Sequence, residues 1–115
     1  MQDQLIDTTI ACWNEAAARR RAALAAEAFA ADATYVDPLM EGRGPDGIGA
    51  GQARFPGLRF RRSGRVDAHH GPLRFCWEPA AGDGPAVAAG TDVAELAADG
   101  RFARVPGFID LAPEA

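Results

Sequence analysis

Apolar side chains recur every three or four positions through residues 3–30, and this spacing predicts helical structure. They form one stripe along Leu5, Ile6, Ile10 and Trp13, which returns at Leu24, Ala28 and Phe29. The residues permit one long helix or two packed helices, because the alanines favour helix throughout. One helix of this length is uncommon in so small a domain, so we expect two, with a turn near residues 14–18.

A short Thr-Tyr-Val strand at residues 34–36 is expected next, and Pro38 stops its pattern. Residues 39–57 are rich in glycine and proline, and a short helix is expected to start at Pro45, because proline is favoured at the first helical position. From Leu58 the period becomes two, which is typical of strands. The strands expected there cover residues 58–70, 73–78, 86–97 and 101–110, with turns at Gly71-Pro72, residues 79–85 and Asp99-Gly100.

Two residues predict irregularities in these strands. Gly64 indicates a β-bulge, and Pro106 indicates an edge strand or a bulge, because proline cannot donate a ladder hydrogen bond. Helices followed by a meander of long strands predict an α+β fold, in which N-terminal helices pack on one curved antiparallel sheet. With 115 residues the chain has room for one core, so residues 1–115 are expected to form a single domain.

Composition narrows the function classes. The net charge of −4 offers no basic surface for nucleic acid. No apolar run approaches a membrane span, and the acidic start has no signal-peptide pattern, so we expect a cytoplasmic protein that binds neither membrane nor nucleic acid. All twelve basic residues are arginine, a bias that is typical of a GC-rich bacterial coding sequence. Cys12 and Cys76 have no CxxC spacing and are expected to be reduced, packed thiols.

Asp37 is the first candidate for chemistry. It ends the string DATYVDP, so a carboxylate flanked by apolar residues lies at the end of a strand. Such a carboxylate could act as a general base toward a bound ligand. The alternative is a structural aspartate that forms a turn before Pro38 by accepting hydrogen bonds from backbone amides.

Asp92 is the second candidate. On its side of the strand lie small residues and one leucine, which would leave volume for a ligand beside the carboxyl: Ala86, Ala88, Gly90, Ala94 and Leu96. Burial there without a cation would raise its pKa and keep it neutral as a hydrogen-bond donor. The opposite side of this strand is also fairly apolar, so the sequence does not decide which of its two faces points inward. The alternative is an ion pair with Arg74 or Arg104.

His70 shares its side of the strand with apolar residues and could be a pocket acid or base, although it adjoins a turn, where histidines are usually solvated. Neighbouring strand residues face opposite sides, so His69 and His70 are expected to make a poor metal pair, and no metal is predicted. The Gly47–Gly51 spacing lacks the full dinucleotide-binding pattern. No serine lies in a GxSxG motif, so nucleophilic catalysis is unsupported.

The order of elements resembles the nuclear transport factor 2-like superfamily, which includes SnoaL-like polyketide cyclases and ketosteroid isomerase. The strings that carry the resemblance are FAADATYVDP at residues 29–38, HHGPLRFCWE at residues 69–78 and GTDVAELAADGRFARVPGFID at residues 90–110. The resemblance covers nearly the whole chain. It implies a cone-shaped apolar pocket between the concave face of the sheet and the helices, and commonly a homodimer formed by the outer face of the sheet.

The resemblance also implies residue roles. Asp37 falls on the base of ketosteroid isomerase, and Asp92 falls near its protonated aspartate donor. Trp13 stands where that enzyme has a tyrosine donor, and an indole is far less acidic than a phenol, so steroid isomerisation is not carried over with the fold. Five aromatic residues are expected to line the pocket: Trp13, Tyr35, Phe60, Phe75 and Trp77.

The main functional hypothesis is a small-molecule pocket protein that catalyses proton transfer without a cofactor, as an isomerase or cyclase does, on an apolar carbonyl compound such as a polycyclic one. Asp37 would be its base, and Asp92 would stabilise the oxyanion. One alternative is a non-catalytic ligand-binding or dimerisation module of the same fold. Another is a dehydratase that uses His70, Tyr35 and Asp37.

Overall fold

The computed structural model describes residues 2–52 and 57–111. Two helices open the chain, α1 at Gln2–Asn14 and α2 at Ala18–Ala28, so the prediction of two helices with a turn between them is confirmed. The side chain of Asn14 accepts a hydrogen bond from the backbone N–H of Phe60 (2.7 Å) and donates one to its carbonyl oxygen (2.8 Å). The end of α1 is therefore tied to the strand that contains Phe60.

The remaining elements largely match the pattern of the sequence, and their bounds are β1 Phe29–Asp37, β2 Met40–Arg43, α3 Gly44–Gln52, β3 Arg59–Ala68, β4 Leu73–Ala80, β5 Ala89–Leu96 and β6 Phe102–Leu111. Strand β1 is longer than the expected strand and follows α2 without a loop. Strand β2 was not predicted, because its glycine and charged residues show no alternation. It pairs with β1 in a tight hairpin, in which Asp37 faces Met40.

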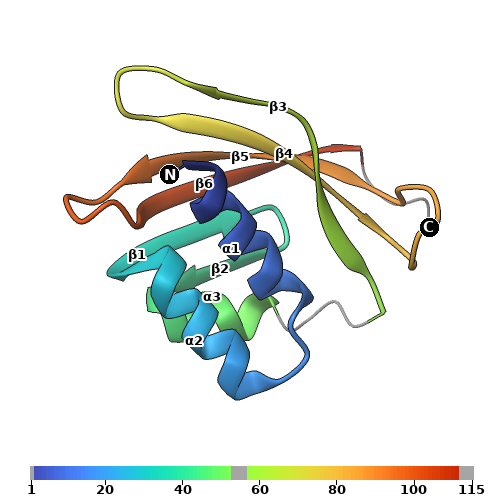
Figure 1. The fold of residues 1–115 in the computed structure, drawn as a ribbon, viewed down its shortest axis with the longest axis horizontal. Helices are drawn as coiled ribbons and strands as arrows, with labels where there is room; N and C mark the ends of the chain where they lie inside the picture. Colours follow the sequence, from blue (N-terminus) through green and yellow to red (C-terminus); the bar gives the residue numbers. More distant parts are fainter. Residues whose placement is uncertain (1, 53–56, 112–115) are drawn as a thin grey trace.

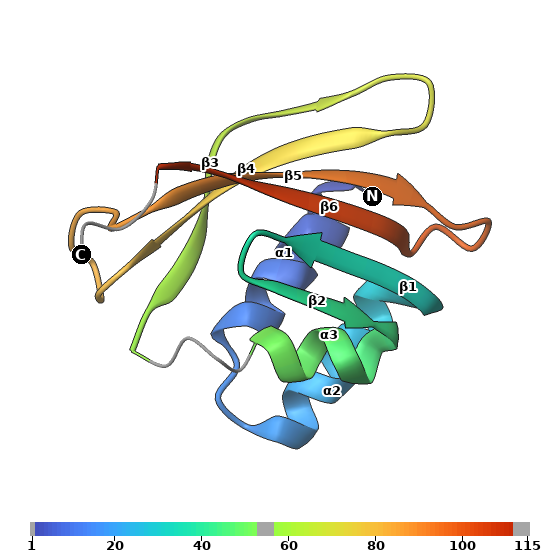
Figure 2. The ribbon, with the colours of Figure 1, turned by 180° about the vertical axis from the view of Figure 1, so that it is seen from behind.

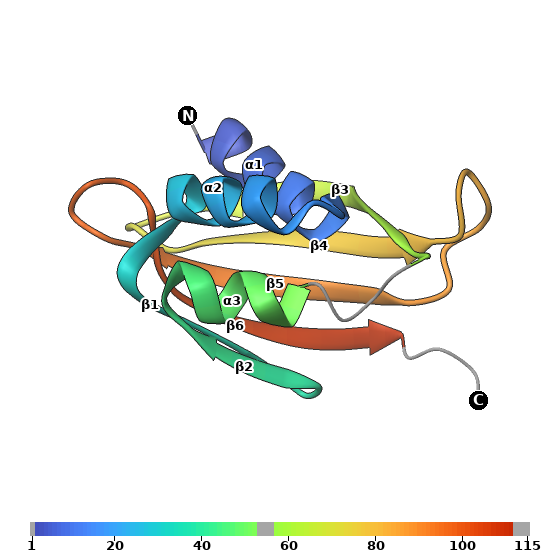
Figure 3. The same cartoon turned by 90° about the horizontal axis from the view of Figure 1, so that it is seen from below.

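All six strands form one sheet in the order β2-β1-β6-β5-β4-β3. Strands β3 to β6 form the predicted antiparallel meander, which crosses the top of Figure 1 with the helices below it. Strand β1 runs parallel to β6, so the sheet is mixed rather than wholly antiparallel. Figure 2 shows β1 and β2 beside β6, and Figure 3 shows α2 and α3 in front of the strands, on the same side of the sheet as α1. The α+β prediction is confirmed.

The two predicted irregularities have different outcomes. Gly64 has a φ of +67°, and the pairing of β3 with β4 shifts between Ser63 and Asp67, so the predicted bulge is confirmed. Pro106 lies in β6, which is flanked by β1 and β5, and neither ladder shifts its register there. The prediction of an edge or a bulge at Pro106 is therefore wrong, because the sequence does not show that β1 returns to cover this side of β6.

The hydrophobic core lies between the concave face of the sheet and the helices. It is built from buried side chains of both layers, among them Ile6, Phe29, Ile48, Phe75 and Phe102. Both cysteines are free thiols, and burial raises the pKa of Cys12 to about 12. No helix in the described ranges is both long and apolar enough to span a membrane.

Candidate active site

The candidate site lies on the concave face of the sheet, where four neighbouring strands present side chains in register. Asp92 on β5 pairs with Phe75 on β4 and with Gly107 on β6, and Tyr35 on β1 pairs with Val105 on β6. Because side chains alternate along a strand, these residues point to the same side of the sheet. The buried residues of β5 are Gly90, Asp92 and Ala94, so Asp92 faces inward.

Asp37 lies at the end of β1, and its carboxylate is held by three hydrogen bonds. Its Oδ1 accepts the backbone N–H groups of Leu39 (2.8 Å) and Met40 (3.0 Å), as a turn-forming aspartate does. Its Oδ2 accepts the hydroxyl of Tyr35 at 2.7 Å. A carboxylate has about four acceptor positions, so one remains for a ligand. The structural and functional interpretations of Asp37 are therefore compatible.

Tyr35 is the only tyrosine of the chain, and its phenol lies in this site. It lies two residues before Asp37 on the same side of β1, and its side chain is fully buried. Burial, the nearby charge of Asp92 and the hydrogen bond to Asp37 all raise the pKa of Tyr35 far above its usual value. The phenol therefore stays protonated and acts as a hydrogen-bond donor to Asp37.

Asp92 is a buried carboxyl without a cationic partner among the described residues. It is 1% exposed, and its Oδ1 accepts the indole N–H of Trp77 at 2.9 Å. Burial raises its pKa to about 7, the hydrogen bond from Trp77 lowers the pKa, and the charge of Asp37 raises it. The alternative of an ion pair between Asp92 and Arg74 or Arg104 is wrong: Arg74 pairs with Asp67, and Arg104 pairs with Glu95.

Gly107 is the point at which these polar groups meet. A Cβ atom added there would lie 2.7 Å from Oδ1 of Asp92, 3.2 Å from the hydroxyl oxygen of Tyr35 and 3.3 Å from Cβ of Asp37. Two carboxyl groups and a phenol therefore surround one position that has no side chain. Gly107 has no recognisable signal in the sequence, because a glycine in a strand becomes informative only once the pairing of β6 with β1 and β5 is known.

An apolar pocket of about 80 Å³ opens beside this cluster. Its wall is formed by residues of α1, β1, β3, β4, β6 and the surrounding loops: Trp13, Asp37, Leu39, Leu58, Phe60, Trp77, Pro79, Val87, Ala88 and Ile109. Asp37 supplies the only charged group of this lining in the described ranges. Asp92 and Tyr35 lie behind the lining, so the two carboxyl groups do not both open into the pocket.

The aromatic residues divide between the pocket and the core. Trp13, Phe60 and Trp77 form a continuous wall, with ring centres 4.9 Å apart for Trp13 and Phe60 and 5.8 Å apart for Phe60 and Trp77. Trp13 also meets the edge of Tyr35 at 5.9 Å. Phe75 instead stacks on Phe102 in the core at 6.2 Å, so it is not part of the pocket lining.

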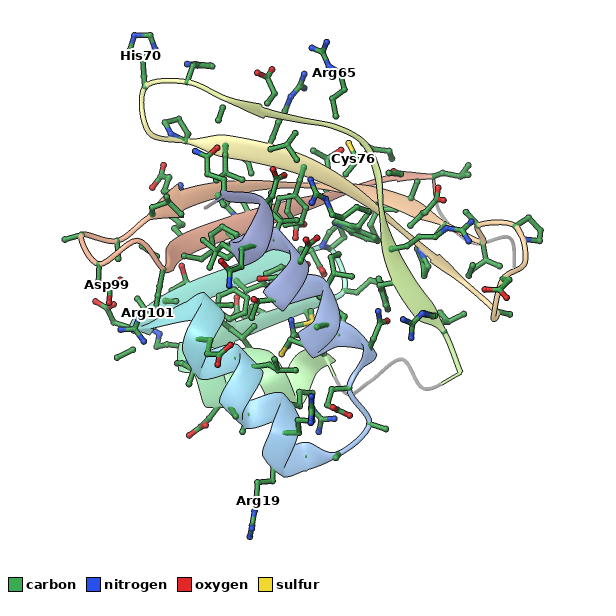
Figure 4. All side chains as sticks on the ribbon, in the orientation of Figure 1. Arg19, Arg65, His70, Cys76, Asp99 and Arg101 are labelled. Atoms are coloured by element: carbon green, nitrogen blue, oxygen red, sulfur yellow. The ribbon has the colours of Figure 1, made fainter. Side chains whose placement is uncertain are left out.

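His70 is not brought to the site. It lies at the turn between β3 and β4, far from the helices in Figure 4, where its side chain is exposed and its φ is +53°. The sequence pattern suggested an inward side chain, but the strand ends at Ala68 and the alternation stops there. The dehydratase hypothesis therefore loses the histidine that it requires.

The two histidines also depart from the expected geometry. They do not point to opposite sides, because both belong to the turn, and their Nδ1 atoms lie 3.2 Å apart. Among residues 2–52 and 57–111, no group of three or more histidine, cysteine or acidic side chains is arranged to hold a metal ion. The polar groups gathered in the described site are the carboxyl groups of Asp37 and Asp92, the phenol of Tyr35 and the indole of Trp77.

Comparisons with known proteins show a clear relationship to a solved structure. No protein-family profile and no curated protein matches this chain. Among solved structures, the chain is similar to an Agrobacterium tumefaciens C58 protein that is provisionally described as an isomerase of the SnoaL-like family. The two share 42% identity over 93% of this chain and 95% of the other, with a TM-score of 0.86.

More distant structures share the fold. A protein from Kribbella flavida, provisionally described as a ketosteroid isomerase, is 22% identical over 97% of this chain and 79% of its own, with a TM-score of 0.69. An NTF2-like protein of unknown function from Cytophaga hutchinsonii is 12% identical over 96% of this chain and 90% of its own, with a TM-score of 0.68. At these identities the likeness concerns the fold alone.

Proposed function

This chain belongs to the SnoaL-like family of the nuclear transport factor 2-like superfamily, and we propose that it is an enzyme that transfers a proton within a small carbonyl compound, with Asp37 as the general base. The observation that carries the proposal is the environment of Asp37. Its carboxylate lines an apolar pocket, and three hydrogen bonds fix its orientation. An oriented carboxylate in apolar surroundings is well suited to take a proton from a carbon acid.

In this proposal Asp37 takes a proton from the carbon next to a carbonyl group and returns it to another position of the same molecule. The hydroxyl of Tyr35 donates a hydrogen bond to Oδ2 of Asp37 and holds its carboxyl group in place through both steps. Asp92 is not part of the pocket lining and acts through its protonation state: while its carboxyl is protonated, the negative charge of this carboxyl pair rests on Asp37. Every group in this transfer is a side chain, so the reaction requires no organic cofactor.

The size of the pocket bears on the substrate class. Ligand pockets commonly measure roughly 300–1,000 Å³, whereas this one measures about 80 Å³. A compound with a single ring or a short chain is closer to this size than the polycyclic compound expected from the sequence. We therefore propose a small apolar carbonyl compound as the ligand.

Hydrogen–deuterium exchange at the carbon next to the carbonyl tests this proposal without a known substrate. Cyclohexanone and 2-cyclohexenone serve as probes in deuterated buffer, and NMR follows the loss of the proton signal. We expect the protein to accelerate exchange, and we expect Asp37→Asn to lower the accelerated rate by about 10²-fold or more, the usual contribution of a general base. Asp32→Asn is the matched control, because Asp32 lies on the same strand with an exposed side chain.

The outcomes separate the two functional classes. Undiminished exchange by a folded Asp37→Asn variant would exclude Asp37 as the base. Binding of the ketones, seen as a change in tryptophan fluorescence, without any exchange by the parent protein would favour the non-catalytic ligand-binding module. Two observations favour the ligand-binding module: the pocket is small, and Asp92 is buried and not part of its lining.

We further propose that a second copy of the chain covers the outer face of the sheet. Phe108 on β6 and Val36 on β1 are 54% and 45% exposed there, on two strands that pair with one another. Exposed apolar side chains that lie close together on a sheet commonly mark an interface.

A further inference from the structure

Trp77 connects the pocket with the buried carboxyl behind it. Its indole N–H donates to Oδ1 of Asp92 at 2.9 Å, across the pairing of β4 with β5. Its ring lines the pocket together with Asp37 and Phe60. One side chain therefore contacts both the space available to a ligand and a carboxyl group that is not part of the pocket lining.

Gly90 allows Trp77 to take this position. Gly90 is the cross-strand partner of Trp77 on β5, and an added Cβ atom would overlap Cζ2, Cη2 and Cε2 of the indole. Because several ring atoms lie about equally close to that position, one side of the ring rests on the backbone of β5. The neighbouring strand thus supports the indole and limits its rotation away from Asp92.

The hydrogen bond from Trp77 distinguishes the two oxygens of Asp92. Oδ1 accepts the indole N–H, whereas no hydrogen bond to Oδ2 is found among the described residues. In a protonated carboxyl the carbonyl oxygen is the better acceptor, so the hydrogen bond to Oδ1 favours the proton on Oδ2. The titratable groups that face Asp92 are the carboxylate of Asp37 and the phenol of Tyr35, both from β1, and no cation faces it within the described ranges.

We propose that Trp77 is a positioning residue for Asp92: its N–H fixes the carboxyl so that Oδ2 carries the exchangeable proton, and its ring links occupancy of the pocket to the presence of that proton. The inference deepens the proposed function: a role of Trp77 in catalysis requires that the proposed proton transfer takes place in this pocket. The linkage is reciprocal, because a ligand that shifts the indole changes the proton affinity of Asp92, and the charge of Asp92 in turn changes the affinity for that ligand. The raised pKa of Asp92, about 7, brings this exchange into the neutral range.

Tryptophan fluorescence gives a direct test, because the chain has only two tryptophans. The Trp13→Phe variant leaves Trp77 as the single emitter. We expect its emission to change in one step between about pH 5 and pH 9, with a midpoint near 7, since ionisation of Asp92 places a charge beside the indole N–H. Adding Asp92→Asn to this background should abolish the step. A step that persists in the double variant would overturn the inference, because it would belong to another group.

A second experiment removes the donor and keeps an aromatic ring. In Trp77→Phe, the ionised form of Asp92 loses its hydrogen bond, so the midpoint of the Asp92 titration should rise by about one pH unit. The measurement is the carboxyl carbon signal of Asp92 in NMR spectra, assigned by its loss in Asp92→Asn. The matched control is Trp13→Phe, which changes the same residue type in the same pocket and should leave the midpoint in place.

An unchanged or lowered midpoint in Trp77→Phe would overturn the inference. If this variant does not fold, the fluorescence experiment still decides the question, since it keeps Trp77. Neither experiment uses a substrate. The results of both experiments are therefore independent of the exchange assay of Asp37→Asn. Failure of the proposed role of Trp77 can thus be distinguished from failure of the proposed role of Asp37.

Discussion

Asp92 is an acidic residue for which folding creates an unfavourable environment. A carboxyl that is 1% exposed, with one neutral hydrogen-bond donor and a neighbouring carboxylate, is difficult to ionise. Soluble domains rarely bury such a group without a cation. Its position next to Asp37 and Tyr35 is therefore more readily explained by a role in the site than by a contribution to stability.

Asp92→Asn should make the fold more stable at alkaline pH. Burial raises the pKa of Asp92 from an ordinary value of 3.8 to about 7. Between these values the folded chain holds a proton that the unfolded chain has lost, so stability falls as the pH rises from about 4 to 7 and stays low above 7. Asparagine keeps the acceptor for Trp77 and carries no charge.

Thermal unfolding at about pH 4, 6 and 8 provides the measurement for this variant. The advantage of Asp92→Asn should be near zero at the lowest pH and reach a few kcal/mol at the highest. The control Asp67→Asn changes an aspartate whose side chain is 49% exposed and should show no such trend. An advantage of Asp92→Asn that is independent of pH would show that burial does not shift this carboxyl.

At the scale of the strands, two glycines create the space for the site. Gly90 on β5 accommodates the ring of Trp77, and Gly107 on β6 accommodates the contacts among Asp92, Tyr35 and Asp37. Glycine in a strand interior usually weakens the strand, and it often marks a place where another group approaches the backbone closely. The two positions lie on neighbouring strands, and Asp92 pairs with Gly107 and accepts the indole N–H of the Trp77 ring that Gly90 accommodates.

Gly107→Ala should destabilise the fold and disturb the site together. The new methyl carbon would lie 2.7 Å from Oδ1 of Asp92, so the carboxyl or the strand must shift, at a cost of about 1–3 kcal/mol. Gly47→Ala is the matched control, because a Cβ at this position of α3 meets only ordinary contacts at 3.9 Å. Alanine in a helix should instead stabilise by about 0.5–1 kcal/mol.

Urea unfolding of both glycine variants gives the two free energies. If Gly107→Ala were as stable as the parent protein, the close approach of the three polar side chains to Gly107 would be wrong. The exchange assay applied to Gly107→Ala then shows whether the geometry around Asp37 has changed as well.

The elements that follow from local patterns could be predicted, and those that depend on pairing could not. The turn after Asn14, the helix near Pro45 and the bulge at Gly64 each have a signal within a few residues. Strand β2 lacks such a signal, and the parallel pairing of β1 with β6 depends on residues far apart in the chain. The wrong expectation for Pro106 and the missed role of Gly107 both follow from that one unseen pairing.

The candidate site follows the same division. Asp37, Asp92 and the aromatic wall could be found from alternation and from the family resemblance. The hydrogen bonds from Tyr35 to Asp37 and from Trp77 to Asp92 were not expected, because they require a phenol and an indole to be placed by register. His70 was misplaced because alternation was extended by two residues beyond the true end of β3.

At the scale of the whole molecule, the outer face of the sheet leads to an expectation about assembly. If a second copy covers Phe108 and Val36, then Phe108→Asp places a charge in the interface and should convert a dimer into monomers, as size-exclusion chromatography with light scattering would show. Ala98→Asp adds the same charge in the exposed hairpin between β5 and β6 and should leave the assembly unchanged. A parent protein that is monomeric at all concentrations would contradict the proposed interface.

The parallel pairing of β1 with β6 also affects the order in which the protein can fold. The first strand that carries site residues is made early, but its partner is the last strand of the sheet. During synthesis, Tyr35 and Asp37 can therefore meet Gly107 only after β6 has emerged from the ribosome, about 70 residues later. Contacts of such long range slow folding. The geometry of the candidate site is thus expected to be among the last features of this molecule to form.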